Sequence, residues 1–174
     1  VFQNHLFLAQ GNSVQNSSLG EPFVWSAVTG AAEFRAGGNV TGLIVMPGND
    51  SAGALGVTTS ASHSVLYGTS SADFKLVALA QGAGARARTL ATLGLNTLAL
   101  SSSGITTLAA SQNYGNFASA SLTANLNSWL QPRIGKVVGC CVSAAKGQYL
   151  LFFSTGEALV LGLVNGKFIG ALPL

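Results

Sequence analysis

The chain has 174 residues, which is enough for one domain with a sizeable hydrophobic core. Only 7% of the residues are charged, against about 25% in a typical soluble domain, and the formal net charge is +3. A surface so poor in charge is typical of a subunit that neighbours cover in a large assembly, and a thinly spread +3 does not by itself indicate nucleic-acid binding. Interruptions by Gly, Ser and Thr exclude a membrane-spanning helix, and the strand candidates fall short of the about nine residues that a membrane-barrel strand requires.

Strand-length apolar segments, separated by clusters of Gly and Ser, follow one another from the N-terminus onward. The N-terminal part holds two of them, residues 5–9 and 22–28. The next group repeats at a spacing of roughly ten residues and comprises residues 40–46, 54–59, 64–68 and 74–80. A third group comprises residues 87–93, 96–101 and 104–110. This punctuation predicts short antiparallel strands joined by tight turns.

One stretch, residues 119–133, breaks the strand pattern. Its large apolar residues recur at the spacing of one helix face: Leu122, Leu126, Trp129 and Leu130. Ser121 is the expected N-cap and Pro132 the expected stop. The sequence therefore predicts one short helix within residues 119–130, no longer than about three turns, packed against a sheet edge or a partner subunit.

The last segment, residues 137–174, predicts four strands. Three turns divide it: Lys146-Gly147, Ser154-Thr155-Gly156 and Asn165-Gly166. Asn-Gly between apolar runs is a strong hairpin signal, because a type I′ turn needs positive φ at both central positions. Period-two alternation places one set of side chains on a buried face and Phe152 on the opposite face. The predicted buried set is Val138, Cys140, Val142, Leu151, Phe153, Leu159, Leu161 and Leu163.

Together these elements predict an all-β chain of consecutive four-stranded antiparallel meanders with one short helix. Meanders that recur at about 40–45 residues are the units of β-propellers, and the predicted units are residues 40–80, 86–131 and 137–174. Three units and a fragment do not close a ring of about four to eight blades. The chain opens at Val1 and stops directly after a predicted strand. We therefore expect residues 1–174 to form one β-rich domain that is a piece of a larger β-propeller.

Few residues offer chemistry. His5 and His63 lack Cys, Asp or Glu at ligand spacing, which favours ordinary surface or hydrogen-bonded histidines over a metal site. Adjacent Cys140 and Cys141 favour two buried thiols over a vicinal disulfide or redox pair. Residues 82–87 half resemble a phosphate-binding glycine loop, but a strand-like segment follows, so a loop between units is favoured. The five acidic residues are not paired in sequence, so a glycosidase-type pair would need distant units. We predict no catalytic residues, no metal and no cofactor, and hence no enzyme.

Four cations are the candidate contacts with DNA or with other subunits. Arg86 and Arg88 lie two residues apart on an expected strand and would share one of its faces, and Arg133 and Lys136 lie between the expected helix and the last unit. Side chains of this kind can contact a nucleic-acid backbone. A solvated edge or a subunit contact is the alternative.

A resemblance to a known family rests on two segments that cover about the last hundred residues. The first, residues 73–133, contains Gly104-Ile105-Thr106 and then Gln112-Asn113-Tyr114-Gly115-Asn116-Phe117 ahead of the expected helix. The second is residues 148–173, a pair of hairpins. Both resemble stretches of tail proteins of short-tailed bacteriophages. Leu150 stands where that family more often has a charged residue, and Thr155 where it has Asp.

The resemblance implies a virion structural protein of the tail, of the nozzle or packaged-DNA-stabilisation type, with a β-propeller domain. Proteins of this group form rings, commonly sixfold, around the DNA exit channel, so the expected partners are copies of this chain, other tail proteins and, through non-specific contacts, packaged DNA. A β-rich carbohydrate-binding adhesin is the alternative. Trp25 and Trp129 lie in unlike contexts, which argues against a repeated sugar site. A propeller glycosidase has the least support.

Overall fold

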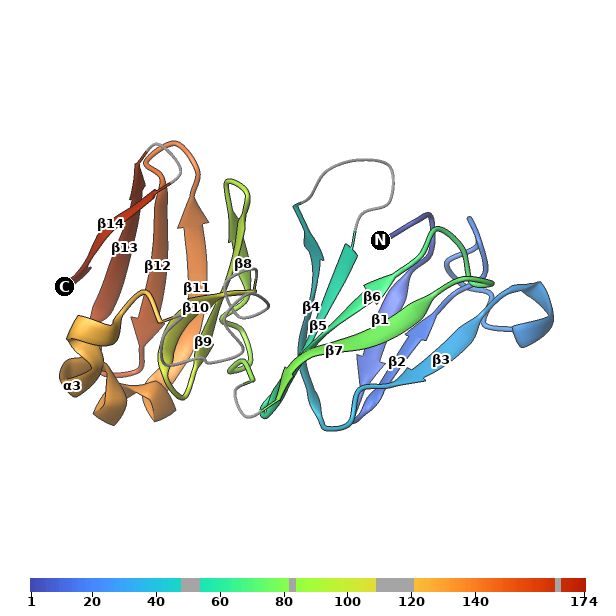
Figure 1. Cartoon of the computed structure of the whole chain (residues 1–174), viewed down its shortest axis with the longest axis horizontal. Helices are drawn as coiled ribbons and strands as arrows, with labels where there is room; N and C mark the ends of the chain where they lie inside the picture. Colours follow the sequence, from blue (N-terminus) through green and yellow to red (C-terminus); the bar gives the residue numbers. More distant parts are fainter. Residues whose placement is uncertain (48–53, 82–83, 109–120, 165–166) are drawn as a thin grey trace.

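The computed structural model describes residues 1–47, 54–81, 84–108, 121–164 and 167–174. Two features of the sequence lie outside these residues: the Asn165-Gly166 turn and the motif from Gln112 to Phe117. The described chain is all-β with one short α-helix, as predicted, and its strands form four antiparallel sheets (Figure 1).

Each sheet is a meander in which strands that follow one another in sequence are hydrogen-bonded neighbours. The first sheet comprises β1 (Phe7–Gln10), β2 (Ser13–Asn16) and β3 (Ala32–Arg35). The second comprises β4 (Val40–Met46), β5 (Ala54–Thr59), β6 (Ser62–Tyr67) and β7 (Lys75–Gln81). The third comprises β8 (Ala91–Leu93), β9 (Asn96–Ser101) and β10 (Gly104–Thr107). The fourth comprises β11 (Val137–Ser143), β12 (Gln148–Phe153), β13 (Ala158–Val164) and β14 (Lys167–Pro173).

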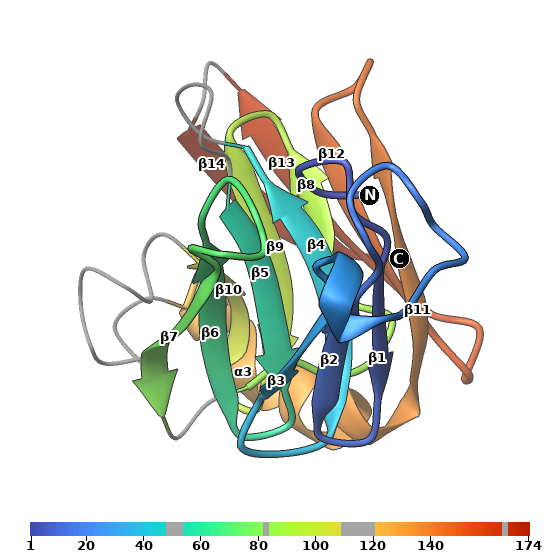
Figure 2. The ribbon, with the colours of Figure 1, turned by 90° about the vertical axis from the view of Figure 1, so that its right-hand side faces the viewer.

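The four sheets stack face to face along the long axis of the molecule (Figures 1 and 2). An apolar core lies at each junction. The core between the first and second sheets includes Phe7, Val14, Leu55, Val57 and Leu66. The core between the second and third is smaller and includes Ala85, Ala99 and Leu108, with Met46 and Leu90 against them. The inner two sheets are therefore covered on both faces.

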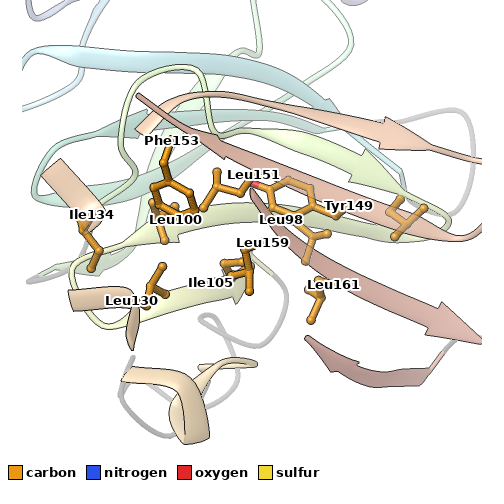
Figure 3. Close-up of a cluster of buried hydrophobic side chains, with 11 residues drawn as sticks. Leu98, Leu100, Ile105, Leu130, Ile134, Tyr149, Leu151, Phe153, Leu159 and Leu161 are labelled. Atoms are coloured by element: carbon orange, nitrogen blue, oxygen red, sulfur yellow. The ribbon is translucent and has the colours of Figure 1, made fainter. Parts of the chain in front are cut away.

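The largest core lies between the third and fourth sheets (Figure 3). Alternate residues of β12, namely Tyr149, Leu151 and Phe153, are all buried there. They meet Leu98 and Leu100 of β9, while Leu159 and Leu161 of β13 extend the same layer. The predicted burial of Leu151, Phe153, Leu159 and Leu161 is confirmed, and Phe152 faces the opposite side with 38% of its surface exposed.

The prediction for Val138 was wrong, because β11 is irregular. The pairing register shifts between Val137 and Gly139, which is the signature of a β-bulge. An extra residue reverses the alternation, so Val137 packs on the core and Val138 is 48% exposed. Cys140, Val142 and Leu163 are partly buried rather than fully buried and pack against this core.

The N-terminal region also differs from the prediction. Residues 22–28 do not form a strand; a short 3₁₀-helix, η1 (Ala27–Thr29), lies there instead. The first sheet is completed by β2 and β3, which the sequence analysis missed because each has only four residues and at least half of these are polar. Residues 87–93 contribute only the three residues of β8.

The predicted helix is shorter and more broken than expected. Residues 124–136 form η2 (Ala124–Leu126), α3 (Asn127–Leu130) and η3 (Gln131–Lys136) in direct succession. Ser121 does not cap a helix, since it forms a β-bridge with Thr106, and Pro132 lies inside η3 rather than ending the helix. The predicted apolar face is confirmed, because Leu130 is buried in the largest core and Leu122, Leu126 and Trp129 pack against it. Among the described residues, no helix has the length and apolar character needed to cross a bilayer.

Candidate functional site

Five of the eight Lys and Arg residues lie near the same ends of the strands, along one edge of the stacked sheets. This end carries the β5–β6 and β9–β10 turns, the end of β3 and the start of β11. In the second sheet Val40 pairs with Thr59, and in the fourth Val137 pairs with Phe153, and Figure 1 shows these strand ends along the same edge of the stacked sheets. We call this end the basic end; its cations are Arg35, Arg86, Arg88, Arg133 and Lys136.

All four cations predicted from the sequence are therefore brought to the same end, and the structure adds Arg35. Arg35 is the last residue of β3. The sequence analysis missed it because β3 itself was missed. Its only local signal is the alternation of Ala32, Glu33, Phe34 and Arg35. The other three cations, Lys75, Lys146 and Lys167, lie at the opposite end, where β7 and β14 begin and where β11 turns into β12.

Arg86 and Arg88 do not lie on a strand, as was expected, but in the exposed connection between β7 and β8. The backbone N–H of Arg86 donates to the carbonyl of Leu100 (2.8 Å), and that of Ala85 donates to Thr59 (2.8 Å). The connection is thus bonded to both the second and the third sheets. Arg88 adopts a left-handed backbone conformation with φ of 63°, which is incompatible with strand geometry.

Arg133 is held in place by partners of its own chain. Its Nε and one terminal nitrogen donate to the Glu157 carboxylate, and the shortest of these contacts is 2.6 Å. The other terminal nitrogen donates to the carbonyl of Trp129 (2.9 Å), and the guanidinium stacks on the Trp129 ring, 4.2 Å from the ring centre. Arg133 lowers the pKa of Glu157 to about 2. This cation therefore clamps the helical segment to the β12–β13 turn, and less of it is free to attract a polyanion.

Two clefts open between successive sheets at the basic end, one on each side of the β5–β6 turn. The first has a volume of about 430 Å³, and Arg35, Ser62 and Ser64 are among its lining residues. The second has a volume of about 450 Å³ and is lined by Arg86 together with small and hydroxyl-bearing residues, including Thr41, Ser60, Ser101 and Ser102. Each cleft thus contributes one arginine beside hydroxyl groups, a set that suits contacts with phosphate oxygens.

The remaining candidates for chemistry are dispersed. His5 and His63 are both buried, and the Nδ1 of His5 hydrogen-bonds to the carbonyl of Ser17 (2.5 Å). Burial lowers the pKa of His63 to about 4. Cys140 and Cys141 are free thiols; Cys140 is half-buried, whereas Cys141 is exposed, so the expected burial of both was wrong. Within the described ranges, no three His, Cys, Asp or Glu side chains are grouped as metal ligands would be.

A smaller hollow of about 230 Å³ lies beside the first sheet. Its lining includes the partly exposed ring of Trp25 and the polar side chains of Gln15, Asn16 and Glu33. An aromatic face beside amide and carboxylate groups can bind a sugar. Compared with known protein families and with curated proteins, the chain matches none of them.

Proposed function

We propose that this chain is a structural component of a bacteriophage tail, of the nozzle or hub type, in which copies form a ring around the DNA exit channel. The observation that supports this most is the stack of four successive antiparallel meanders. Stacked meanders are how β-propellers are built, and a β-propeller is what the resemblance to tail proteins implies. The low share of charged residues, 7%, suits a subunit whose surface is largely covered.

In this proposal the protein acts by packing and not by catalysis. The basic end guides DNA through backbone contacts, because contacts with phosphates position nucleic acid whereas contacts with base edges read its sequence. A conduit must pass every sequence, so scattered arginines and a lysine suit this role. The ring is held by heterologous contacts, in which two different patches of each subunit meet around a cyclic axis.

The tail assignment is tested by mass spectrometry on purified virions of the phage that encodes this chain. We expect the chain in intact particles, at several copies per tail. A chain that is made during infection but is lacking from purified particles would refute the assignment. Imaging of isolated tails then counts the subunits around the axis.

The role of the basic end is tested by fluorescence anisotropy with two unrelated DNA duplexes at several salt concentrations. We expect weak binding that is equal for both sequences and that falls as salt rises. The double variant Arg86→Ala with Arg88→Ala should reduce the salt slope by about 2, because each lost phosphate contact removes about 1. Lys146→Ala, at the opposite end, is the matched control and should leave the slope unchanged. In virions, we expect the double variant to leave assembly intact or only slightly altered. A preference for one of the two duplexes would contradict a conduit.

The hollow beside Trp25 favours carbohydrate binding at a cell surface as the second candidate. This candidate predicts that an oligosaccharide from the host surface changes Trp fluorescence in the wild type and not in Trp25→Ala. Trp129, which packs edge-on against Phe153, provides the control variant Trp129→Phe. Unchanged fluorescence in the wild type at millimolar sugar would exclude this site.

A further inference from the structure

We propose that the outer face of the fourth sheet, turned away from the largest core, pairs with the same face of a second copy of this chain. The face is defined by the register. Gly139, Phe152 and Ala158 form one cross-strand row, and a second row runs through all four strands: Cys141, Leu150, Val160 and Leu172. Val138, turned outward by the bulge, adds to the same face.

Two rows of this face are apolar, whereas the rim near the β11–β12 turn carries Ser143 and Gln148, and Lys167 pairs there with Val164. In the sequences of β11 to β14 the only charged residue is Lys167, which begins β14 at the rim of the sheet. Val138 and Leu172 are 48% and 61% exposed in the isolated chain. The largest apolar patch on a monomeric protein is often a binding surface. Each face of the two inner sheets, by contrast, is covered by a neighbouring sheet.

The outer face of the first sheet cannot cover the outer face of the fourth sheet. On the outer face of the first sheet, one row comprises Leu8, Gln15 and Glu33, and the other comprises Gln10, Ser13 and Arg35. Glu33 is exposed there, and its carboxylate accepts a hydrogen bond from Ser13 (2.7 Å). Stacking this face on the fourth sheet would bury the Glu33 charge against hydrocarbon, which is strongly unfavourable. The two apolar rows of the fourth sheet hold no charged residue and are complementary to the same rows of another copy, and two such faces can pack about 10 Å apart as in a β-sandwich.

The size of the face sets the strength of the pairing. Four strands of six or seven residues cover about 19 Å by 22 Å at ordinary strand spacing, or roughly 400 Å² per copy counted as flat. The pair thus buries on the order of 1,000 Å² once side-chain relief is included, which is the lower range of specific interfaces. We expect a reversible dimer with a dissociation constant on the order of micromolar. The pairing is isologous, so it goes beyond the cyclic ring contacts of the proposed function, which join two different patches.

Sedimentation of the purified chain over a range of concentrations tests the pairing. The wild type should pass from monomer to dimer. Leu150→Lys and Val160→Lys, in the centre of the face, should each remain monomeric at concentrations at which the wild type is fully dimeric, with unchanged circular dichroism. Leu8→Lys, on the outer face of the first sheet, is the matched control and should dimerise like the wild type. A wild type that stays monomeric would overturn the proposal, and so would equal loss of association in Leu8→Lys, which indicates head-to-tail contacts.

Cysteine cross-linking tests the pairing without introducing a charged side chain into the sheet. Its outcome therefore does not depend on variants that misfold. Cys141 is exposed on the proposed interface, whereas Cys140 faces the core. A bismaleimide should cross-link two wild-type chains, Cys141→Ser should abolish the product, and Cys140→Ser should retain it. Cross-linking that depends on Cys140 alone, or on neither cysteine, would refute the proposal that the chains pair through this face. A chain that is found in virions yet remains monomeric would refute the pairing while leaving the tail assignment intact.

Discussion

Replacement of Gly84 by Ala tests how closely the second and third sheets approach each other. Gly84 lies in the connection from β7 to β8, against the turn that ends β5. A Cβ atom at Gly84 would overlap the carbonyl oxygen of Thr59 and the backbone nitrogen of Ala61. These are backbone atoms that cannot rotate away, so the connection must move and the bond from Ala85 N–H to the Thr59 carbonyl must lengthen or break. Relief of the overlap costs about 1–3 kcal/mol, and a buried donor left without a partner costs about 1–3 kcal/mol more.

We therefore expect Gly84→Ala to lower the free energy of unfolding by about 2–6 kcal/mol, a large part of the stability of a small domain. Urea unfolding followed by circular dichroism measures this change. Gly135→Ala is the control: no atom lies within 4 Å of a Cβ there, and Gly135 sits within η3, so we expect unchanged or slightly higher stability. Equal effects of the two substitutions would show that Gly84 is not packed against the β5–β6 turn as described.

Three further predictions concern the core and its ionisable groups. Phe153→Ala should lower the free energy of unfolding by about 3–5 kcal/mol, because the ring is 3% exposed and packs edge-on to Trp129. Phe152→Ala, on the other face of the sheet, should lower it by less than about 1 kcal/mol in dilute solution. Similar losses for the two variants would refute the assignment of the two sheet faces. The pKa of His63 falls from 6.5 to about 4 on folding, so its contribution to stability is full above pH 6.5 and is lost as the pH falls to 4. That loss amounts to about 3 kcal/mol, and urea unfolding of His63→Gln should show no such slope in this window. Arg133 lowers the pKa of Glu157 from 4.5 to about 2, so the stability from this pair should disappear between those pH values in the wild type and not in Arg133→Ala; parallel pH profiles would argue against the pair.

The period-two pattern of β12 and β13 was enough to predict the alternation of their buried side chains. Nothing in the sequence marks the bulge in β11, because it comes from the way two strands pair and not from one residue type. The first sheet escaped prediction for a related reason: its strands have four residues each and become recognisable only when Val14 and Phe34 pack on the second sheet. The apolar face of the helix was predicted correctly, but the continuity of the helix was not. Ser121, the expected N-cap, forms a β-bridge with Thr106 instead.

The candidate site shows the same division. The sequence identified four of the five cations at the basic end, but spacing placed Arg86 and Arg88 on a strand, whereas they occupy a connection with a left-handed residue at Arg88. The partners of Arg133 could not be predicted, since Glu157 is 24 positions away and comes close only through the β12–β13 turn. Gly84, which first suggested a phosphate loop, is explained by the backbone of the neighbouring sheet.

The unequal cores have a consequence for how the molecule opens. Among the described residues, eleven buried side chains unite the third and fourth sheets and seven unite the first and second, whereas three lie at the junction between these pairs. Cooperative units of a fold follow the distribution of buried contacts. The amide hydrogens of β5 and β6 and those of β9 and β12 should thus exchange with solvent as two separate groups, each with its own opening free energy. The chain would then behave as two foldons joined at the connection that carries Arg86.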